Sequence, residues 1–393
     1  MTSSIFPLSR LPFGFGEKEL YKRDQVPEEF KELYILRGYR SPRSSPKQCF
    51  YSIFIATNET FNFWTHFLPA LYFLWRLVDM WGEMDFFGPE GKFTQPVLAL
   101  MVNVCLFLFM SAIAHTFNAM SDKARHVCFF LDYGALSLYC VGAASAYKSY
   151  SIPKDLEHST LMKFYIPVAM VNSVFSVLFA CQTRFMAYGI KKKLLRFVSF
   201  SVPFIWDQVP LYYRILYCDT PECQGGGCLF LFRQNIFASL SAFLYTSHMP
   251  ERFSPGSFDI IGHSHQLFHI FSVLGSYAQL EGVLLDLQAN KDAMTVAGKL
   301  SLDYDRIDTY ALYRVLILII VNAVIIVYYS LRLYNKDTTA PPCSQSNPCL
   351  SGYIHKDGVS PVTPTKKFDA FSDSTLLNKN HNKSPTKSEK KVQ

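Results

Sequence analysis

Charged residues are scarce in this chain of 393 residues: Asp, Glu, Lys and Arg together make up 18% of it, against 50% hydrophobic residues. The length alone would suggest two or three soluble domains. The apolar residues, however, stand in long blocks and lack the amphipathic spacing of soluble helices. One block, "LYRVLILIIVNAVIIVYY", contains a single charged residue, which disfavours a large soluble all-α protein and predicts a membrane protein.

Two further absences narrow the class of protein. The first sixty residues are polar and have no short apolar core beside a small-residue cleavage site, so no signal peptide is expected. The 10 cysteines are too few for a disulfide scaffold in a chain of this length. Three of them, Cys218, Cys223 and Cys228, lie in one short loop, "YCDTPECQGGGC", which could hold one disulfide in an oxidising compartment.

Blocks of about 20 mostly apolar residues are long enough to cross a bilayer as helices, and the chain has eight of them. They cover residues 62–80, 96–117, 127–146, 164–183, 195–217, 228–248, 265–285 and 309–331. Several of these blocks contain internal charges. The sequence therefore predicts an all-α, multi-pass membrane protein, with the lipid bilayer as its surroundings.

The charges of the loops orient the predicted helices. Lys and Arg are enriched in the N-terminal segment and in the loops after the second and fourth blocks, "NAMSDKARH" and "TRFMAYGIKKKLLR". The first loop, the cysteine loop and the loop before the last block are acidic. Because positive residues concentrate on the cytosolic side of membrane proteins, we expect both termini in the cytosol and the cysteine loop outside.

We expect three parts along the chain. Residues 1–60 form a cytosolic segment, in which "VPEEFKELYILRGYR" predicts one amphipathic helix lying on the membrane or against the bundle, with Pro27 at its first position and Gly38 at its end. Residues 61–332 form the transmembrane domain. Residues 333–393 are rich in Ser, Thr, Pro, Asn and Lys and predict a disordered cytosolic tail.

With this orientation, polar and titratable residues from three helices meet at one membrane depth. Ser111 and His115 lie four residues apart on one face of the second helix, near its cytosolic end. Asp132 lies near the start of the third helix, in "FFLDYGA". His265 and His269 share one face at the start of the seventh, in "DIIGHSHQLFH". Ionisable residues inside a membrane are costly and are functional candidates for that reason.

This set of side chains suits a zinc ion, which takes imidazole nitrogens in a tetrahedral arrangement. His115, His265 and His269 would be the ligands, and Asp132 would act on the bound water as a base or serve as a ligand itself. Ser111 would hydrogen-bond that water or a substrate carbonyl. A pair of histidines four apart on an apolar helix is more often packing than metal ligation. The addition of His115 and Asp132 at the same depth favours the metal.

Other polar residues in the blocks have structural interpretations. His263 is expected at the membrane edge, with ligation as the alternative, and His66 in the core. Asp207 lies in a block that two prolines interrupt, and such breaks often line a cavity. It either faces a ligand there or pairs with Arg214 or Arg233. A cavity among so many aromatic side chains would suit an apolar, flat or lipid-like molecule.

Several motifs resemble, in order and spacing, those of the progestin and adipoQ receptor family: "NETFNFWTH", "SAIAH", "FFLDYGA" and "PERFSPGSFDIIGHSHQLFHI". The likeness covers residues 27–331 and points to the membrane progestin receptor branch, of gamma or delta type. It implies a seven-helix core with a cytosolic N-terminus, and an eighth transmembrane helix in this branch. It also implies a zinc site near the inner leaflet, with His115, His265 and His269 as ligands and Asp132 and Ser111 around the bound water.

For this branch, the resemblance implies a steroid receptor of the cell membrane that binds progestins and signals rapidly through G proteins. The wider superfamily includes alkaline ceramidases, which leaves open a zinc-dependent hydrolase acting on the amide of a sphingolipid. Nothing in the sequence indicates a nucleic-acid partner. A conventional G-protein-coupled receptor is disfavoured, because the N-terminus is expected in the cytosol and the last block lacks Asn-Pro-x-x-Tyr. We expect the receptor, with the hydrolase as the alternative.

Overall fold

The computed structural model describes residues 20–88, 91–187, 189–220, 223–296 and 307–338. Within these ranges the regular structure is helical, apart from one isolated β-bridge between Tyr21 and Tyr39, and the predicted all-α class is confirmed. A short helix, α1 (Pro46–Ser52), precedes the long ones. The long helices are α2 (Thr60–Glu83), α3 (Gly91–Phe117), α4 (Asp122–Ala146), α5 (Thr160–Thr183), α6 (Ile190–Tyr217), α7 (Gly226–Ser247), α8 (Ser264–Val296) and α9 (Ala311–Thr338).

Each predicted block coincides with one long helix to within two residues at its ends or lies inside it. Six of the described helices, namely α3, α4, α5, α7, α8 and α9, are long and apolar enough to cross a membrane. The other two, α2 and α6, are as long but less apolar, because polar and charged residues interrupt them. Helix α9 continues to Thr338, six residues into the predicted tail, and residues 339–393 lie outside the described part of the chain.

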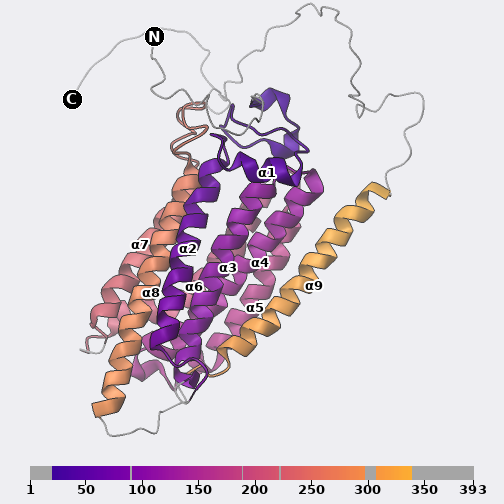
Figure 1. The fold of residues 1–393 in the computed structure, drawn as a ribbon. Coiled ribbons are helices and arrows are strands. Elements are labelled where there is room, and N and C mark those ends of the chain that lie inside the picture. Colours follow the sequence, from indigo (N-terminus) through magenta and orange to yellow (C-terminus); the bar gives the residue numbers. More distant parts are fainter. Residues whose placement is uncertain (1–19, 89–90, 188, 221–222, 297–306, 339–393) are drawn as a thin grey trace, which may run out of the picture. The chain divides into compact units, whose positions relative to one another are not determined.

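Short loops join most of the long helices, which lie side by side in alternating directions (Figure 1). Residues 20–59 pack over one end of the bundle, which we call the capped end: the Ser44 amide donates to the Ala119 carbonyl at 3.1 Å, and Arg40 Nη1 donates to the Thr116 carbonyl at 2.7 Å. We call the opposite end, with residues 218–225, the disulfide end. Because α3 ends and α4, α6 and α8 begin at the capped end, their terminal residues can meet there.

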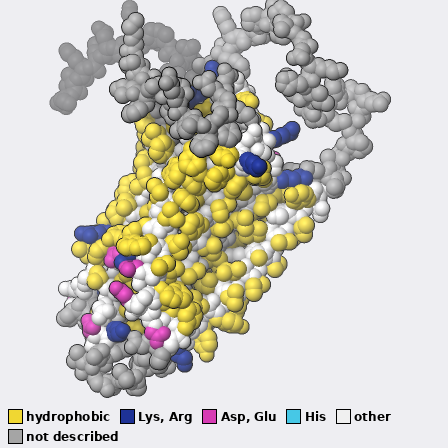
Figure 2. Space-filling view, viewed as in Figure 1, with side chains coloured by type: hydrophobic (Ala, Val, Ile, Leu, Met, Phe, Trp, Pro, Cys, Tyr) yellow, Lys and Arg dark blue, Asp and Glu magenta, His cyan; other side chains and the backbone are white. Residues whose placement is uncertain are grey.

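The outer surface of the bundle is strongly apolar. Exposed large side chains include Trp75, Val78, Phe164, Phe175, Leu316 and Val324. In Figure 2 hydrophobic side chains cover the middle of the visible face, and the visible acidic side chains gather toward the disulfide end. An apolar belt of this kind is what a surface in contact with lipid tails requires.

Glycines set the close contact between α7 and α8. A Cβ atom on Gly227 would lie 2.8 Å from the carbonyl oxygen of Gly282, and one on Gly282 would lie 3.2 Å from that of Gly227. Small residues let helix backbones approach closely in membrane bundles. The two helices therefore pack backbone against backbone at this point.

A polar cluster lies among the buried side chains at the centre of the bundle. Helix α4 continues as a π-helical turn, η3 (Tyr147–Ser151), which begins with the fully buried Tyr147. Its hydroxyl donates to Gln234 Oε1 at 2.7 Å and accepts from Gln279 Nε2 at 2.6 Å and Gln208 Nε2 at 3.5 Å. One phenol thus connects the end of α4 with α6, α7 and α8.

The predicted amphipathic helix in the N-terminal segment is wrong. The segment contains a 3-10 turn, η2 (Glu28–Phe30), and Tyr34 has a left-handed backbone with φ of 63°, which an α-helix cannot accommodate. Val26, Ile35 and Tyr39 form a small core of their own. Burial raises the pKa of the Tyr39 phenol to about 12. Packing of these side chains on one another takes the place of the predicted helix.

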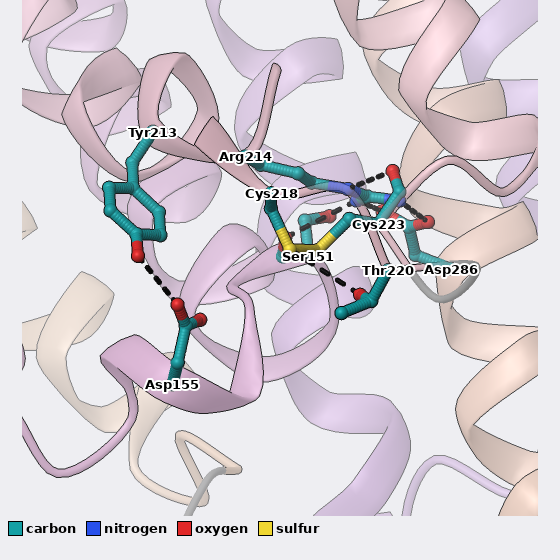
Figure 3. The surroundings of a disulfide bond; sticks show 8 residues. All are labelled: Ser151, Asp155, Tyr213, Arg214, Cys218, Thr220, Cys223 and Asp286. Atoms are coloured by element: carbon teal, nitrogen blue, oxygen red, sulfur yellow. Dashed lines mark hydrogen bonds and ion pairs between the residues drawn. A yellow bond between two sulfur atoms is a disulfide. The ribbon is translucent and has the colours of Figure 1, made fainter. Parts of the chain in front are cut away.

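A disulfide joins Cys218 and Cys223, as the cysteine loop led us to expect, and Cys228 is free (Figure 3). Beside it, Arg214 Nε donates to the Cys223 carbonyl at 3.0 Å. The same guanidinium forms a bidentate pair with Asp286, with N–O distances of 2.6 and 3.0 Å. The loop, α6 and α8 are therefore connected through one buried arginine.

Candidate metal centre

The ends of two helices bring three histidines together. His115 lies two residues before the end of α3, and His265 and His269 lie in the first two turns of α8, at the same end of the bundle. One nitrogen atom from each ring can be chosen so that all three lie within 4.8 Å of one another. His115 and His269 are buried, and His265 is half-buried. The structure thus brings together the three predicted ligands.

Hydrogen-bond partners determine which nitrogen of two rings carries the proton. His115 Nδ1 lies 2.7 Å from Glu59 Oε2, and His269 Nδ1 lies 3.1 Å from the carbonyl oxygen of Asn62. A carboxylate and a carbonyl only accept, so each Nδ1 is the donor. The Nε2 atoms of both rings are then free of protons and able to bind a metal.

The spacing of the rings fits a tetrahedral ion. Nitrogen ligands bound at about 2.0–2.1 Å to one tetrahedral zinc ion lie roughly 3.3–3.4 Å apart. His115 Nε2 and His265 Nε2 are separated by 3.3 Å. Two nitrogen lone pairs that face each other at this distance repel unless a proton or a cation lies between them. The donor set and the distance therefore suit a cation of this kind.

Glu59 is the residue of the site that the sequence did not reveal. It immediately precedes α2 and accepts from Asn62 Nδ2 and Asn118 Nδ2, both at 2.8 Å, in addition to His115. Burial acts to raise the pKa of its carboxyl, but His115 and Arg40 hold that pKa well below its usual value. The signal was present in "NETFNFWTH", where an acid precedes an apolar block, but its partner could be identified only in the fold.

Arg40 supports the same end of α3. Its guanidinium donates to the carbonyl oxygens of His115 at 2.8 Å and Thr116 at 2.7 Å, and also to Asn118 Oδ1. These are free carbonyls of the last helical turn, where a cation is favourable. The N-terminal segment thus fixes the helix end that carries the first histidine.

Two more histidines lie close to the centre. His66 is buried, as expected, and stacks on His269 with ring centroids 3.6 Å apart and an angle of 14° between the planes. Thr65 Oγ1 approaches His269 Nδ1 at 3.0 Å. His263 is buried, lies outside the three-histidine group and places Nε2 3.2 Å from the carbonyl oxygen of Asn58. His269 is therefore held from two sides by α2.

The two remaining predicted residues lie beside the histidines without bonding to them. Ser111 is buried on α3, one turn before His115. Asp132 is half-buried on α4, where its carboxyl and His115 interact electrostatically. Within the described part of the chain, neither side chain makes a hydrogen bond to the three histidines. Their roles around a bound ion stay predictions.

The expected pairing of Asp207 with an arginine is wrong. Arg214 is bound to Asp286, and Arg233 lies over the ring of Phe230. The Asp207 side chain is 3% exposed, and its Oδ1 atom has no hydrogen-bond partner among the described residues. The sequence could not predict this, because α8 supplies a carboxylate nearer to Arg214 than the one on its own helix.

Fold and site together define a class: a multi-pass helical membrane protein with a three-histidine centre at one end of its bundle. The family of haemolysin-III related proteins matches residues 54–280. The chain belongs to this family, the haemolysin-III and progestin and adipoQ receptor family.

Its relatives include two types of membrane progestin receptor. The chain is 37% identical to membrane progestin receptor gamma of Homo sapiens over 317 residues, covering 80% of this chain and 94% of that protein. It is 44% identical to membrane progestin receptor delta of Homo sapiens over 282 residues, covering 70% of this chain and 80% of the relative. Membrane progestin receptor gamma-A of Danio rerio is 41% identical over 291 residues, covering 70% and 84%. The predicted gamma or delta likeness is confirmed as a similarity.

Proposed function

We propose that this protein is a progestin receptor of the cell membrane. The observation that carries the proposal is the similarity to proteins named membrane progestin receptors, which extends over 94% of the length of one of them. A membrane setting agrees with the apolar belt of the bundle, and a steroid can reach the helices by dissolving in the bilayer. The ligand would be an apolar molecule with few polar groups.

The polar cluster around Tyr147 is a candidate for sensing such a ligand. Gln208, Gln234 and Gln279 are all buried and bind the same hydroxyl, from three different helices. A steroid ketone or hydroxyl that replaced one of these bonds would change the contacts of α6, α7 and α8 together. Helix movement of this kind would then reach cytosolic partners, for which we propose a G protein.

We infer that the three histidines hold a zinc ion. His115, His265 and His269 would bind it through nitrogen, and Asp132 and Ser111 would lie around its remaining position. In a receptor the ion would connect the end of α3 with the start of α8; in a hydrolase it would supply Lewis-acid chemistry. Glu59 and the Asn62 carbonyl keep two of the rings in the tautomer that such binding needs.

We propose that all eight long helices, α2–α9, cross the membrane, with the capped end and both termini in the cytosol. The disulfide between Cys218 and Cys223 supports this orientation, since such bonds persist in oxidising compartments. The charges within α2 are partly neutralised, because Arg76 Nη2 lies 3.1 Å from Glu281 Oε1 of α8. This pairing lowers the cost of placing α2 in a bilayer.

The hydrolase alternative has less support. The relatives are named as receptors, and neither Asp132 nor Ser111 is hydrogen-bonded to the histidines among the described residues. A general base needs to reach the water that it activates, either directly or through one more water. The alternative is tested by the same experiment as the receptor.

The experiment measures zinc content, progesterone binding and release of sphingoid base from ceramide on one purified preparation. Wild-type protein that holds stoichiometric zinc, binds progesterone saturably and releases no sphingoid base is the expected result. His269→Ala should lose the zinc. If Asp132→Asn keeps zinc but abolishes a ceramide cleavage that wild type performs, the protein is a hydrolase. If wild-type protein shows no saturable progesterone binding, the receptor proposal is contradicted.

A further inference from the structure

Three arginines from three helix ends gather at the capped end, outside the histidine centre. Arg125 belongs to the first turn of α4, Arg184 follows α5 directly, and Arg196 lies near the start of α6. The Cζ atoms of Arg125 and Arg184 lie 5.3 and 4.8 Å from the centroid of the Phe129 ring. Arg196 Cζ lies 5.7 Å from the Tyr133 ring, and these two rings are 6.3 Å apart. We call Arg125, Arg184 and Arg196 the arginine cluster.

The arginine cluster holds more positive than negative charge. Arg125 pairs with Glu32 at 2.5 Å, and this carboxylate also acts at longer range on Arg184 and Arg196. Neither Arg184 nor Arg196 has a carboxylate within ion-pair distance among the described residues. Lys192, also on α6, adds its charge to both. Asp122, which lies 3.4 Å from His126 Nε2, acts at longer range on Arg125 and Arg184. Two carboxylates thus lie among four cations.

Several donors of the cluster are unused. Arg184 Nε donates to His126 Nδ1 at 2.9 Å, but its two terminal nitrogens donate to no described residue. Arg125 Nε is buried and has no hydrogen-bond partner within the described ranges. Arg196 donates Nε and Nη2 to one atom, Thr183 Oγ1, at 3.1 and 2.9 Å, and it also has a side-chain hydrogen bond with Tyr245. The Arg184 residue as a whole is half-buried.

We propose that the arginine cluster is a binding site for a phosphate-bearing anion. Of the three guanidiniums only that of Arg125 is paired with a carboxylate, so the cluster keeps a net positive charge whose mutual repulsion and desolvation are costly. A phosphate group offers about two negative charges and three acceptor oxygens, which arginine recognises with its planar fork. A carboxylate, with one charge and two oxygens, would satisfy fewer of the free donors.

The position of the cluster fits a phosphorylated lipid headgroup. It lies where α4 and α6 begin and α5 ends, at the depth where helix ends meet the polar part of a bilayer. The exposed apolar side chains of Leu194, Phe197 and Val198 follow on α6 and can contact acyl chains. Basic pockets between helix ends bind anionic headgroups in this way. A soluble phosphorylated compound has the same chemistry and is the second source to test.

This site adjoins the histidine centre at one aromatic ring and uses different polar side chains. His115 meets the edge of Phe129 with ring centroids 6.2 Å apart, and the guanidiniums of Arg125 and Arg184 lie near the same ring. No residue of the arginine cluster contacts a histidine of the metal group through a hydrogen bond among the described residues. Loss of anion binding should therefore leave zinc content and steroid binding unchanged.

The test uses full-length protein in nanodiscs of phosphatidylcholine, with and without phosphatidylinositol 4,5-bisphosphate. Retained lipid is measured by native mass spectrometry, and affinity by titration with a fluorescent form of the same lipid. We expect the double variant Arg184→Gln/Arg196→Gln to bind at least tenfold more weakly than wild type. The matched control is Arg233→Gln/Arg252→Gln, which removes the same charge from exposed positions outside the cluster and should bind as wild type does.

A second arm titrates soluble inositol 1,4,5-trisphosphate into protein in nanodiscs of phosphatidylcholine alone. Binding of the lipid only assigns the site to a headgroup, and equal binding of the soluble compound assigns it to a free phosphorylated ligand. Either result supports the proposal when Arg184→Gln/Arg196→Gln abolishes it. The proposal is overturned if wild type binds neither probe. It is also overturned if the cluster variant, with normal zinc content, binds as well as the Arg233→Gln/Arg252→Gln control.

Discussion

At the scale of single residues, the candidate centre depends on the histidines and also on the groups that hold a proton on Nδ1 of their rings. His115 can face a metal through Nε2 only while an acceptor holds the proton on Nδ1. Glu59 is that acceptor, and its own position is fixed by Asn62 and Asn118. If the proposed zinc ion is bound, a change at Glu59 acts on its affinity without removing a ligand.

We expect Glu59→Gln to weaken zinc binding by about 10–100-fold, the usual cost of losing a partner of a metal-bound histidine. The amide can present its NH2 group to Nδ1 and so favour the wrong tautomer. Zinc affinity is measured by competition with a chromogenic chelator on purified protein. Asp259→Asn is the control, since Asp259 is a buried carboxylate that binds the Leu36 amide at 3.0 Å instead of a histidine. Equal affinities of the two variants would contradict the role of Glu59.

The histidines of the site were predictable, and the reason is periodicity. His265 and His269 lie four residues apart, and the alternation of loop charge placed His115 at the same end of the bundle. Glu59 and Arg40 were not predictable in the same way, because they lie outside the apolar blocks. Their partners depend on how residues 20–59 fold over the capped end, and no short-range pattern records that.

At the scale of helices, close packing of α7 on α8 makes a strong prediction about glycine. A Cβ atom on Gly227 would collide with the Asp286 carboxylate and lie 2.8 Å from the Gly282 carbonyl oxygen, whereas one on Gly226 would make an ordinary 3.4 Å contact with Leu285. We expect Gly227→Ala to lower stability by about 1–3 kcal/mol, as overpacking does, and Gly226→Ala to be neutral or slightly stabilising. Thermal unfolding of both variants in the same detergent measures the difference. Two equal midpoints would show that α7 can move away from α8 at no cost.

The ion pair between Arg214 and Asp286 makes a second prediction at this scale. Both side chains are buried, so Asp286→Asn leaves a guanidinium without its counter-charge and should cost about 3–5 kcal/mol. Glu281 lies on α8 like Asp286 and pairs with Arg76 of α2, and both side chains of this pair are partly exposed. Glu281→Gln breaks the pair and should cost at most about 1 kcal/mol. Unfolding in a denaturing detergent compares the two. If the Glu281 variant were as unstable as the Asp286 variant, burial would not explain the cost of breaking these ion pairs.

Helix positions followed from the sequence more reliably than helix partners did. Apolar blocks of bilayer length predict where α2–α9 lie, since a span must be apolar and satisfy its own backbone. Arg214 pairs with Asp286 rather than with Asp207 because of how α6 and α8 are rotated about their axes, and hydropathy does not predict that rotation. The N-terminal segment misled the prediction for a related reason: its residues fold into turns, in which Val26, Ile35 and Tyr39 pack on one another.

At the scale of the whole molecule, the two ends of the bundle differ in chemistry. The capped end carries the histidine centre and the arginine cluster, and the disulfide end carries the cysteine loop. If the membrane separates a reducing from an oxidising compartment, only one orientation keeps the disulfide oxidised. The loop charges favour the same orientation independently. Both arguments favour the proposed orientation, with the capped end in the cytosol.

This orientation predicts which cysteines a membrane-impermeant maleimide can reach in intact cells. Cys218 and Cys223 should be labelled only after an impermeant phosphine has reduced their disulfide, because oxidised sulfur does not react with maleimide. Cys343 and Cys349, in the expected cytosolic tail, should be labelled only after the membrane is permeabilised. The variant Cys218→Ser/Cys223→Ser is the control and should gain no label on reduction. Labelling of the tail in intact cells, or of the loop only after permeabilisation, would reverse the orientation and place the histidine centre and the arginine cluster on the outer side.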